Sequence, residues 1–325
     1  MKKSKIVLLG VASLILLASC ASTPADDSQQ KQASQEKTIE KSEPNQIEIQ
    51  IQETAEELFL KSLEGFSIKK VSSPKEITKG RSFSEPFVFS VLKADASAAE
   101  GFSLTLEYPA SKSENQINYE KIELLTDSEG KISFTPEKPA FSAKTTVKVY
   151  PTPVSNDAEL AENLKAFTAE ADWKVKSDIA ARGAVLFVWD YNEKDRPINN
   201  SYDIQAEFRS RGITMVGNGP VNETSYIGKP KSLYKDTYDI IGGTAYGYLI
   251  YGTIKFEQAV TALEDGSGYY CILKAEIGAM SMKNGELIYS SEITYESKGK
   301  NWNECVSKGK EKLAELVVND IIYGL

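Results

Sequence analysis

Residues 246–256 read YGYLIYGTIKF, and this stretch decides the fold of the C-terminal half of the chain. Its β-branched and aromatic residues predict a long strand. A second long strand is predicted over residues 269–280. It is followed by Lys283-Asn284-Gly285-Glu286, in which Asn-Gly favours a two-residue hairpin turn, and then by a partner strand over residues 287–295. Three long strands in succession therefore belong to one predicted sheet.

Outward from these strands, the pattern alternates between strands and helices. The run AVLFVW is continuously apolar, as expected of a strand that is buried on both faces. The closing helix has an apolar stripe at helical spacing. The predicted order is β-α-β-α-β-β-β-α, an α+β domain over residues 154–325 with a mixed sheet and helices on its faces. The domain begins with a helix over 157–171, which comes before this order. Strands cover 184–189 and 213–216, and helices cover 197–211, 232–244 and 301–323.

Alternation along residues 269–279 indicates that one face of the sheet is buried under helices. A binding partner would then use the other face, helix 197–211, or the loop over residues 217–230. That loop reads GNGPVNETSYIGKP and carries no folding signal of its own. Loops held by a rigid scaffold are common recognition sites, although an ordinary mobile connection is the alternative.

Residues 66–153 show a different pattern, in which short alternating strands are separated by turn residues. Strands are predicted over 86–92, 102–108, 119–125, 131–134 and 146–150. The segment 126–136, TDSEGKISFTP, resembles the end of a bacterial immunoglobulin-like repeat. The resemblance implies an all-β immunoglobulin-like sandwich that serves as a spacer or as a recognition module. A short helical segment over 47–65 precedes it, and Pro151 and Pro153 mark its end.

The N-terminus has the features of an export signal. Lys2, Lys3 and Lys5 precede an uncharged run of 13 residues, which is too short to span a membrane. The run ends in Leu17-Ala18-Ser19-Cys20, which resembles the lipobox of bacterial lipoproteins. The resemblance implies cleavage of residues 1–19, acylation of Cys20 with lipid chains such as palmitate, and anchorage in a bilayer. Residues 20–46 hold one aliphatic side chain larger than Ala, so they are expected to form a disordered tether.

Composition excludes several classes of function. The chain has no histidine, so it offers neither a Ser-His-Asp triad nor an imidazole metal ligand. Loss of residues 1–19 removes three of the 38 basic residues and none of the 46 acidic ones, which leaves a net charge of −11 and argues against nucleic acid. We therefore predict no catalytic residue, no metal site, no cofactor and no enzymatic activity.

Two cysteines remain once Cys20 is acylated. Cys271 lies on the buried face of its strand, and Cys305 lies on the apolar face of the closing helix, so the two are expected to meet. Export makes a disulfide between them chemically feasible. A pair of buried free thiols is the alternative, and the sequence leaves both open.

The C-terminal domain also resembles a known superfamily. The segments that carry the resemblance are residues 243–254 (GTAYGYLIYGTI), residues 274–290 with GELIYS at their end, and the helix over 306–321. They are similar to the domain shared by the curli-secretion lipoprotein and the penicillin-binding-protein activator lipoproteins. The superfamily's aspartate is replaced here by Gly247 or Tyr248, depending on the alignment.

This resemblance implies a non-enzymatic binding or regulatory lipoprotein for a cell-wall synthesis or envelope assembly partner. Ala21 stands where some lipoproteins retained at the inner membrane have an aspartate, which favours the outer membrane. We expect the periplasmic face of that membrane rather than the cell surface. A surface adhesin is the first alternative. A secretion-pore subunit is less favoured, because connections 261–268 and 282–286 are short and polar. The partner's identity and the oligomeric state are not specified by the sequence.

Overall fold

The structure is a computed structural model that describes residues 53–113, 116–200, 202–221 and 223–325. The predicted signal peptide, lipobox residues Leu17, Ala18 and Ser19, lipidated Cys20 and tether lie outside these residues, so they stay predictions. Within the described ranges, no helix combines the length and the apolar character that crossing a bilayer would require.

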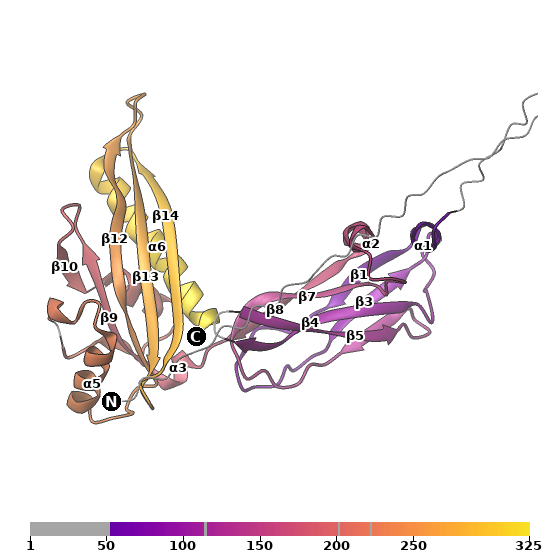
Figure 1. The fold of residues 1–325 in the computed structure, drawn as a ribbon, viewed down its shortest axis with the longest axis horizontal. Coiled ribbons are helices and arrows are strands. Elements are labelled where there is room, and N and C mark those ends of the chain that lie inside the picture. The colour runs from indigo at the N-terminus through magenta and orange to yellow at the C-terminus, as the bar shows by residue number, and fades with distance from the viewer. Residues whose placement is uncertain (1–52, 114–115, 201, 222) are drawn as a thin grey trace, which may run out of the picture. The chain divides into compact units, whose positions relative to one another are not determined.

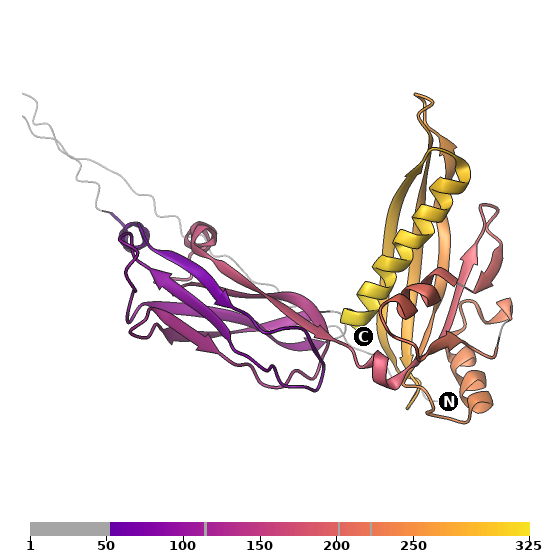
Figure 2. The same cartoon turned by 180° about the vertical axis from the view of Figure 1, so that it is seen from behind.

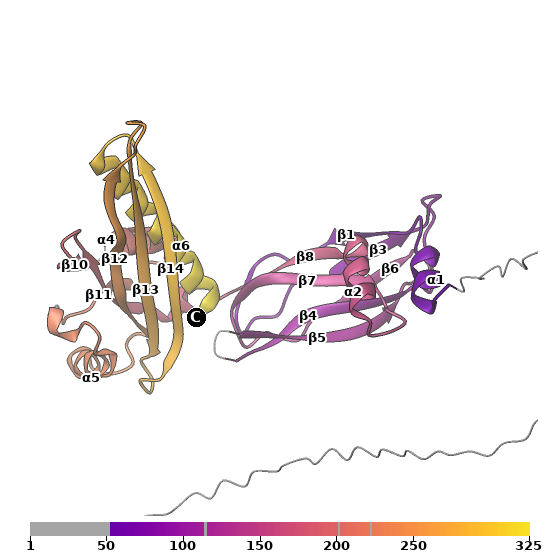
Figure 3. The same cartoon turned by 45° about the horizontal axis from the view of Figure 1, so that its top comes forward.

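The first part of the described chain is a β-domain in which two sheets share one hydrophobic core (Figure 1 and Figure 3). One sheet has the order β1-β3-β6 and the other β2-β8-β7-β4-β5. The sequence predicted several separate strands here, and the structure contains them; the specific immunoglobulin-like assignment stays a prediction. The elements are α1 (Ala55–Ser62), β1 (Ser67–Ser72), β2 (Ile77–Thr78), β3 (Phe87–Leu92), β4 (Ser103–Ser113), β5 (Gln116–Leu125), β6 (Lys131–Phe134), β7 (Ala143–Pro151), α2 (Ala158–Leu164), the 3₁₀ turn η1 (Lys165–Phe167) and β8 (Ala169–Lys176).

Strand β8 corrects the predicted helix over residues 157–171 and the predicted domain boundary after residue 153. The helix ends early, and residues 169–176 alternate between buried and exposed side chains, as in a strand with one face in a core. β8 pairs antiparallel with β7, and Trp173 stacks on Phe87 with ring centroids 5.9 Å apart. The β-domain therefore continues to Lys176, because pairing with β7 and burial of Trp173 favour the strand.

The short helix predicted within 47–65 is present as α1. Thr54 and Glu57 form a capping box, which satisfies free backbone N–H groups of the first turn. Leu63 is buried against Leu160 and Leu164 of α2. Leu58 of the same helix is 54% exposed.

The second part is an α/β domain with one twisted sheet in the order β10-β9-β12-β13-β14, in which β11 also pairs with β9. β9 runs parallel to β11 and β12, while β10, β13 and β14 run antiparallel to their neighbours. The predicted mixed sheet is therefore confirmed. The elements are α3 (Ile179–Arg182), β9 (Ala184–Tyr191), β10 (Pro197–Asn200), α4 (Tyr202–Ser210), β11 (Val216–Asn218), the 3₁₀ turn η2 (Thr224–Tyr226), α5 (Pro230–Ile241), β12 (Tyr248–Ala262), β13 (Tyr269–Ser281), β14 (Leu287–Gly299) and α6 (Trp302–Gly324).

Strand β10 corrects the prediction that Pro197 opens a helix. Proline is tolerated at the start of an edge strand, which is the place that Pro197 takes. The buried Asn200 amide accepts a hydrogen bond from the N–H of Val188 at 2.9 Å and donates one to the carbonyl of Leu186 at 3.0 Å. These contacts with β9 hold the segment as a strand, and the helix α4 begins only after it. The strand predicted over 213–216 likewise lies later, as β11.

The two faces of this sheet are covered unequally. Helices α4 and α6 pack on one face, where α6 lies behind β12–β14 in Figure 1 and in front of them in Figure 2. On the other face, α5 and η2 pack against β9, β12 and the end of β13. Alternation along β13 was predicted to bury one face, and this is confirmed. The buried residues are Cys271, Leu273, Ala275, Ile277 and Ala279.

A buried ion pair joins β9 to α6. The side chain of Asp190 is 6% exposed, and its Oδ2 lies 3.7 Å from Nζ of Lys310. Its Oδ1 is buried and accepts no hydrogen bond within the described residues. Burial raises the pKa of Asp190 to about 6, against the opposing influence of Lys310.

This raised pKa predicts that acid stabilises the wild-type chain relative to Asp190→Asn. The folded chain binds the Asp190 proton more tightly than the unfolded chain, so this group's contribution to the free energy of unfolding rises as the pH falls through about 6. Urea unfolding at about pH 5 and about pH 8 should show a relative gain of about 1 kcal/mol at the lower pH. The exposed Asp195→Asn serves as the control, and equal pH dependence of the two variants would contradict the assignment.

Candidate binding groove

The partly covered face of the sheet carries a groove of about 590 Å³ beside η2 and α5. Its floor follows from the strand register, which aligns outward-facing residues of β9, β12, β13 and β14 in rows. The first row is Phe187, Tyr251, Gly278 and Ser290. The second row is Trp189, Thr253, Glu276 and Glu292. The rows change from aromatic on β9 to polar on β14.

The aromatic end of the groove lies where η2 and α5 cover the sheet. The rings of Phe187 and Trp189 meet edge to face with centroids 5.9 Å apart, and Tyr226 packs edge-on against Phe187 at 6.4 Å. The hydroxyl of Tyr226 donates a hydrogen bond to Asp236 at 2.6 Å, which fastens η2 to α5. The wall of the groove is therefore held by side-chain contacts as well as by the backbone.

Trp189 carries an unusual buried group. The residue is 5% exposed, and its indole N–H has no acceptor within the described residues. A buried donor without an acceptor costs about 1–3 kcal/mol. The atom is covered by protein, so this donor lies beneath the aromatic end and outside the open space of the groove.

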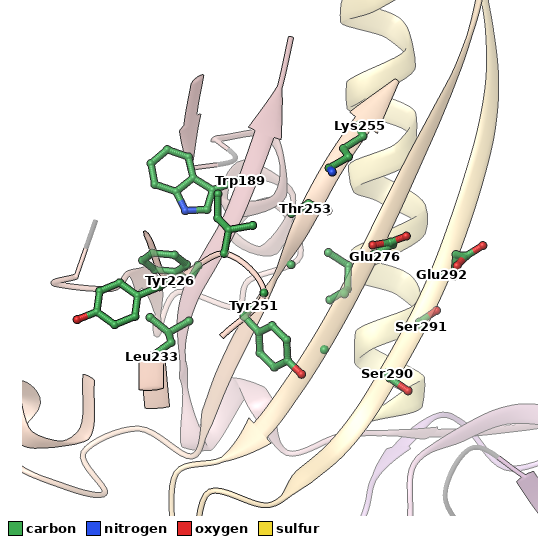
Figure 4. A pocket seen from close by; sticks show the side chains of 16 residues that line it. Trp189, Tyr226, Leu233, Tyr251, Thr253, Lys255, Glu276, Ser290, Ser291 and Glu292 are labelled. Atoms are coloured by element: carbon green, nitrogen blue, oxygen red, sulfur yellow. The ribbon is translucent and has the colours of Figure 1, made fainter. Parts of the chain in front are cut away.

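Tyr251 forms the middle of the floor. Figure 4 shows its side chain reaching from β12 toward β13. A Cβ atom on Gly278, the residue opposite, would lie only 2.5 Å from Cζ of Tyr251. The ring therefore lies directly on the backbone at Gly278, and a glycine is what lets it lie there. Partial burial raises the pKa of the Tyr251 hydroxyl.

The polar end is organised by Lys274. Its Nζ lies 2.8 Å from Glu292 and 3.3 Å from Glu276, so one ammonium group holds both carboxylates on the sheet face. The hydrogen bond with Glu292 raises the pKa of Lys274. Both glutamate side chains are more than half exposed, so their remaining oxygen lone pairs face solvent. This end of the groove is rich in hydrogen-bond acceptors.

The predicted recognition surfaces contribute to this groove unequally. The loop over residues 217–230 supplies Tyr226, Ile227 and Gly228 to its wall, and the open sheet face supplies its floor. The predicted helix 197–211 supplies none of the lining. The described residues contain no group of three or more His, Cys, Asp or Glu side chains placed to hold a metal ion. The prediction that the chain is not an enzyme stays a prediction.

The two remaining cysteines lie away from the groove, on the helix-covered face. Cys271 and Cys305 are fully buried free thiols whose sulfur atoms are 3.5 Å apart. Burial raises the pKa of the Cys271 thiol, because the thiolate would be poorly solvated there. The structure thus brings the predicted pair together, and whether the two are bonded in the cell stays a prediction.

We expect both thiols to be present and protected in the folded chain. Iodoacetamide should leave Cys271 and Cys305 unmodified in the native protein, because both are buried and burial also raises the pKa of the Cys271 thiol. Unfolding in urea without reductant should then expose both to alkylation, which peptide mass spectrometry detects. A single peptide pair that stays cross-linked and unlabelled after unfolding would establish the disulfide instead.

Comparison with known proteins gives one family match. Residues 183–322 match the family model described as the TP0693-like lipoprotein, C-terminal domain. The α/β domain is therefore similar to a lipoprotein domain, which associates the chain with the cell envelope. The match does not extend to the curli-secretion and activator superfamily, so that finer resemblance stays a prediction. A comparison with curated proteins finds no match.

Several solved structures are similar to part of the chain. Lipoprotein GNA1162 from Neisseria meningitidis is 18% identical, with 43% of this chain and 97% of that chain covered and a TM-score of 0.26. A variant of the PelC dodecamer from Paraburkholderia phytofirmans is 15% identical, with 44% and 90% covered and a TM-score of 0.26. The hypothetical protein CT253 from Chlamydia trachomatis is 12% identical, with 43% and 93% covered and a TM-score of 0.27. These scores carry no functional argument.

Proposed function

We propose that the chain is a lipid-anchored, non-enzymatic binding module of the cell envelope that engages its partner through the groove. The observation that carries the proposal is the groove itself, a concave surface with an aromatic end and a polar end on a rigid sheet. Such surfaces are typical of binding sites. The family match of the same domain to a lipoprotein domain supports the envelope setting.

The proposed lipid anchor determines where in the cell the protein acts. Acylation of Cys20 would hold the chain on a bilayer, and a tether over residues 20–46 would let the folded part reach about 25–30 Å on average. We place the protein on the periplasmic face of the outer membrane, with a component of cell-wall synthesis or envelope assembly as its partner. The negative net charge suits neither nucleic acid nor an anionic membrane surface as the ligand.

A photo-cross-linking amino acid at the groove tests this proposal in intact cells. Placed at Glu292, on the polar end, it should give adducts with an envelope component. Placed at Lys298, an exposed position on the same strand about 20 Å away, it should give none. Adducts from both positions, or from neither, would count against the groove as the binding site. Cys20→Ala should abolish the Glu292 adducts by releasing the chain from the membrane.

A surface adhesin is the second candidate, and exposure of the protein on cells separates it from the first. We expect an external protease to leave the chain intact on whole cells, because a periplasmic location shields it. Permeabilisation of the outer membrane should then permit cleavage, which immunoblotting measures. Cleavage on whole cells at an undiminished rate would favour the adhesin and would contradict the periplasmic assignment.

A further inference from the structure

We infer that the groove binds a neutral saccharide, with one sugar ring stacked on Tyr251. The inference rests on the proposed function, since it concerns the same groove, and it specifies the chemical class of the ligand. Three observations carry it: an aromatic platform on the floor, a row of acceptors beside the platform, and the pairing of the nearby charged groups with one another.

The platform is the ring of Tyr251. The hydroxyl end of the ring lies close to the backbone at Gly278, and the residue lines the groove. The free face of an aromatic ring carries negative potential from the π-system. One face of a pyranose ring presents aliphatic C–H groups, which are weakly positive and apolar. The platform therefore matches a sugar ring in both shape and polarity.

The acceptors lie in the neighbouring row of the floor. Glu276 is on β13 and Glu292 on β14, while Thr253 adds a hydroxyl on β12. Neighbouring strands are about 4.8 Å apart, so Glu292 lies about 10 Å from β12. A ligand that reaches from Tyr251 to Glu292 therefore extends beyond a single sugar ring. Sugar hydroxyls would donate to these carboxylates, which Lys274 already orients.

The charged side chains beside the groove favour a neutral ligand over an ionic one. Lys274 lies within 3.3 Å of both glutamates, so a cationic ligand would compete with an ammonium group that is already in place. An anionic ligand would meet the same two carboxylates. Lys255 does not provide a free cation, because its Nζ lies 3.7 Å from Asp195 and 4.4 Å from the centre of the Tyr191 ring. The charged groups beside the groove are thus already paired with one another, Lys274 with the two glutamates and Lys255 with Asp195.

Titration of the full-length lipidated chain tests the inference, in a detergent without a sugar headgroup. The neutral probes are cellotriose and chitotriose, and the ionic probes are spermidine and tri-galacturonate. Saturation-transfer NMR and calorimetry should show a neutral trisaccharide binding with a Kd of about 1 mM or tighter, and neither ionic probe binding. Failure of both neutral trisaccharides to bind would overturn the inference, and so would preferential binding of spermidine.

Variants at Tyr251 and Gly278 test whether the ring of Tyr251 is the surface on which the sugar stacks. Tyr251→Ala should weaken binding by about tenfold or more, while Tyr251→Phe should keep it, because stacking needs the ring and not the hydroxyl. Gly278→Ala should also weaken binding by lifting the ring, with no loss of cooperative unfolding. Tyr119→Ala removes a tyrosine that is 40% exposed on β5, outside the groove, and is the control. Equal affinity of Tyr251→Ala and wild type would overturn the assignment.

The in-cell cross-linking separates this inference from the proposed function. Protein adducts at Glu292 without any saccharide binding would reject the saccharide and keep the binding module. Absence of both adducts and saccharide binding would reject the two together.

Discussion

The α/β domain depends on the packing of α6 against one face of β12, β13 and β14. The helix buries Leu313, Val317 and Ile321 against the alternate residues of these strands, which include Leu273 and Ala275. Side chains along a strand alternate between its two faces, so this packing decides which residues point away from the helix. The groove is formed by those remaining residues, at the part of the opposite face that α5 and η2 leave open.

Local sequence was sufficient to predict those helices and strands whose sequence signals lie within a few residues of one another. The long strands around Asn284-Gly285 and the closing helix were predictable, since a turn and a helical stripe depend on near neighbours only. The errors occurred where pairing with a distant strand decides the structure. Pro197 was misread as a helix start, although Asn200 bonds to β9. Residues 169–171 were assigned to a helix, although they pair with β7.

The candidate site was predictable only in outline. The open sheet face and the loop that contains Tyr226 were identified from alternation and from the lack of structure in the loop. The rows of the floor were not, because they depend on the register between strands far apart in sequence. Gly278 shows why the sequence alone was not enough. In the sequence, a glycine at this position indicates only a weakened strand. That it makes room for the Tyr251 side chain is seen only in the structure.

The separation of the two faces has a consequence for how relatives of this domain could diverge. Positions 251, 253, 276 and 292 line the groove, while their sequence neighbours Ile250, Ile254, Ala275 and Ile293 pack in the core under the helices. Selection can therefore act on the two sets independently. Substitutions in the first set would alter the preferred ligand without disturbing the packing of α6, so one scaffold could serve lipoproteins with unrelated ligands.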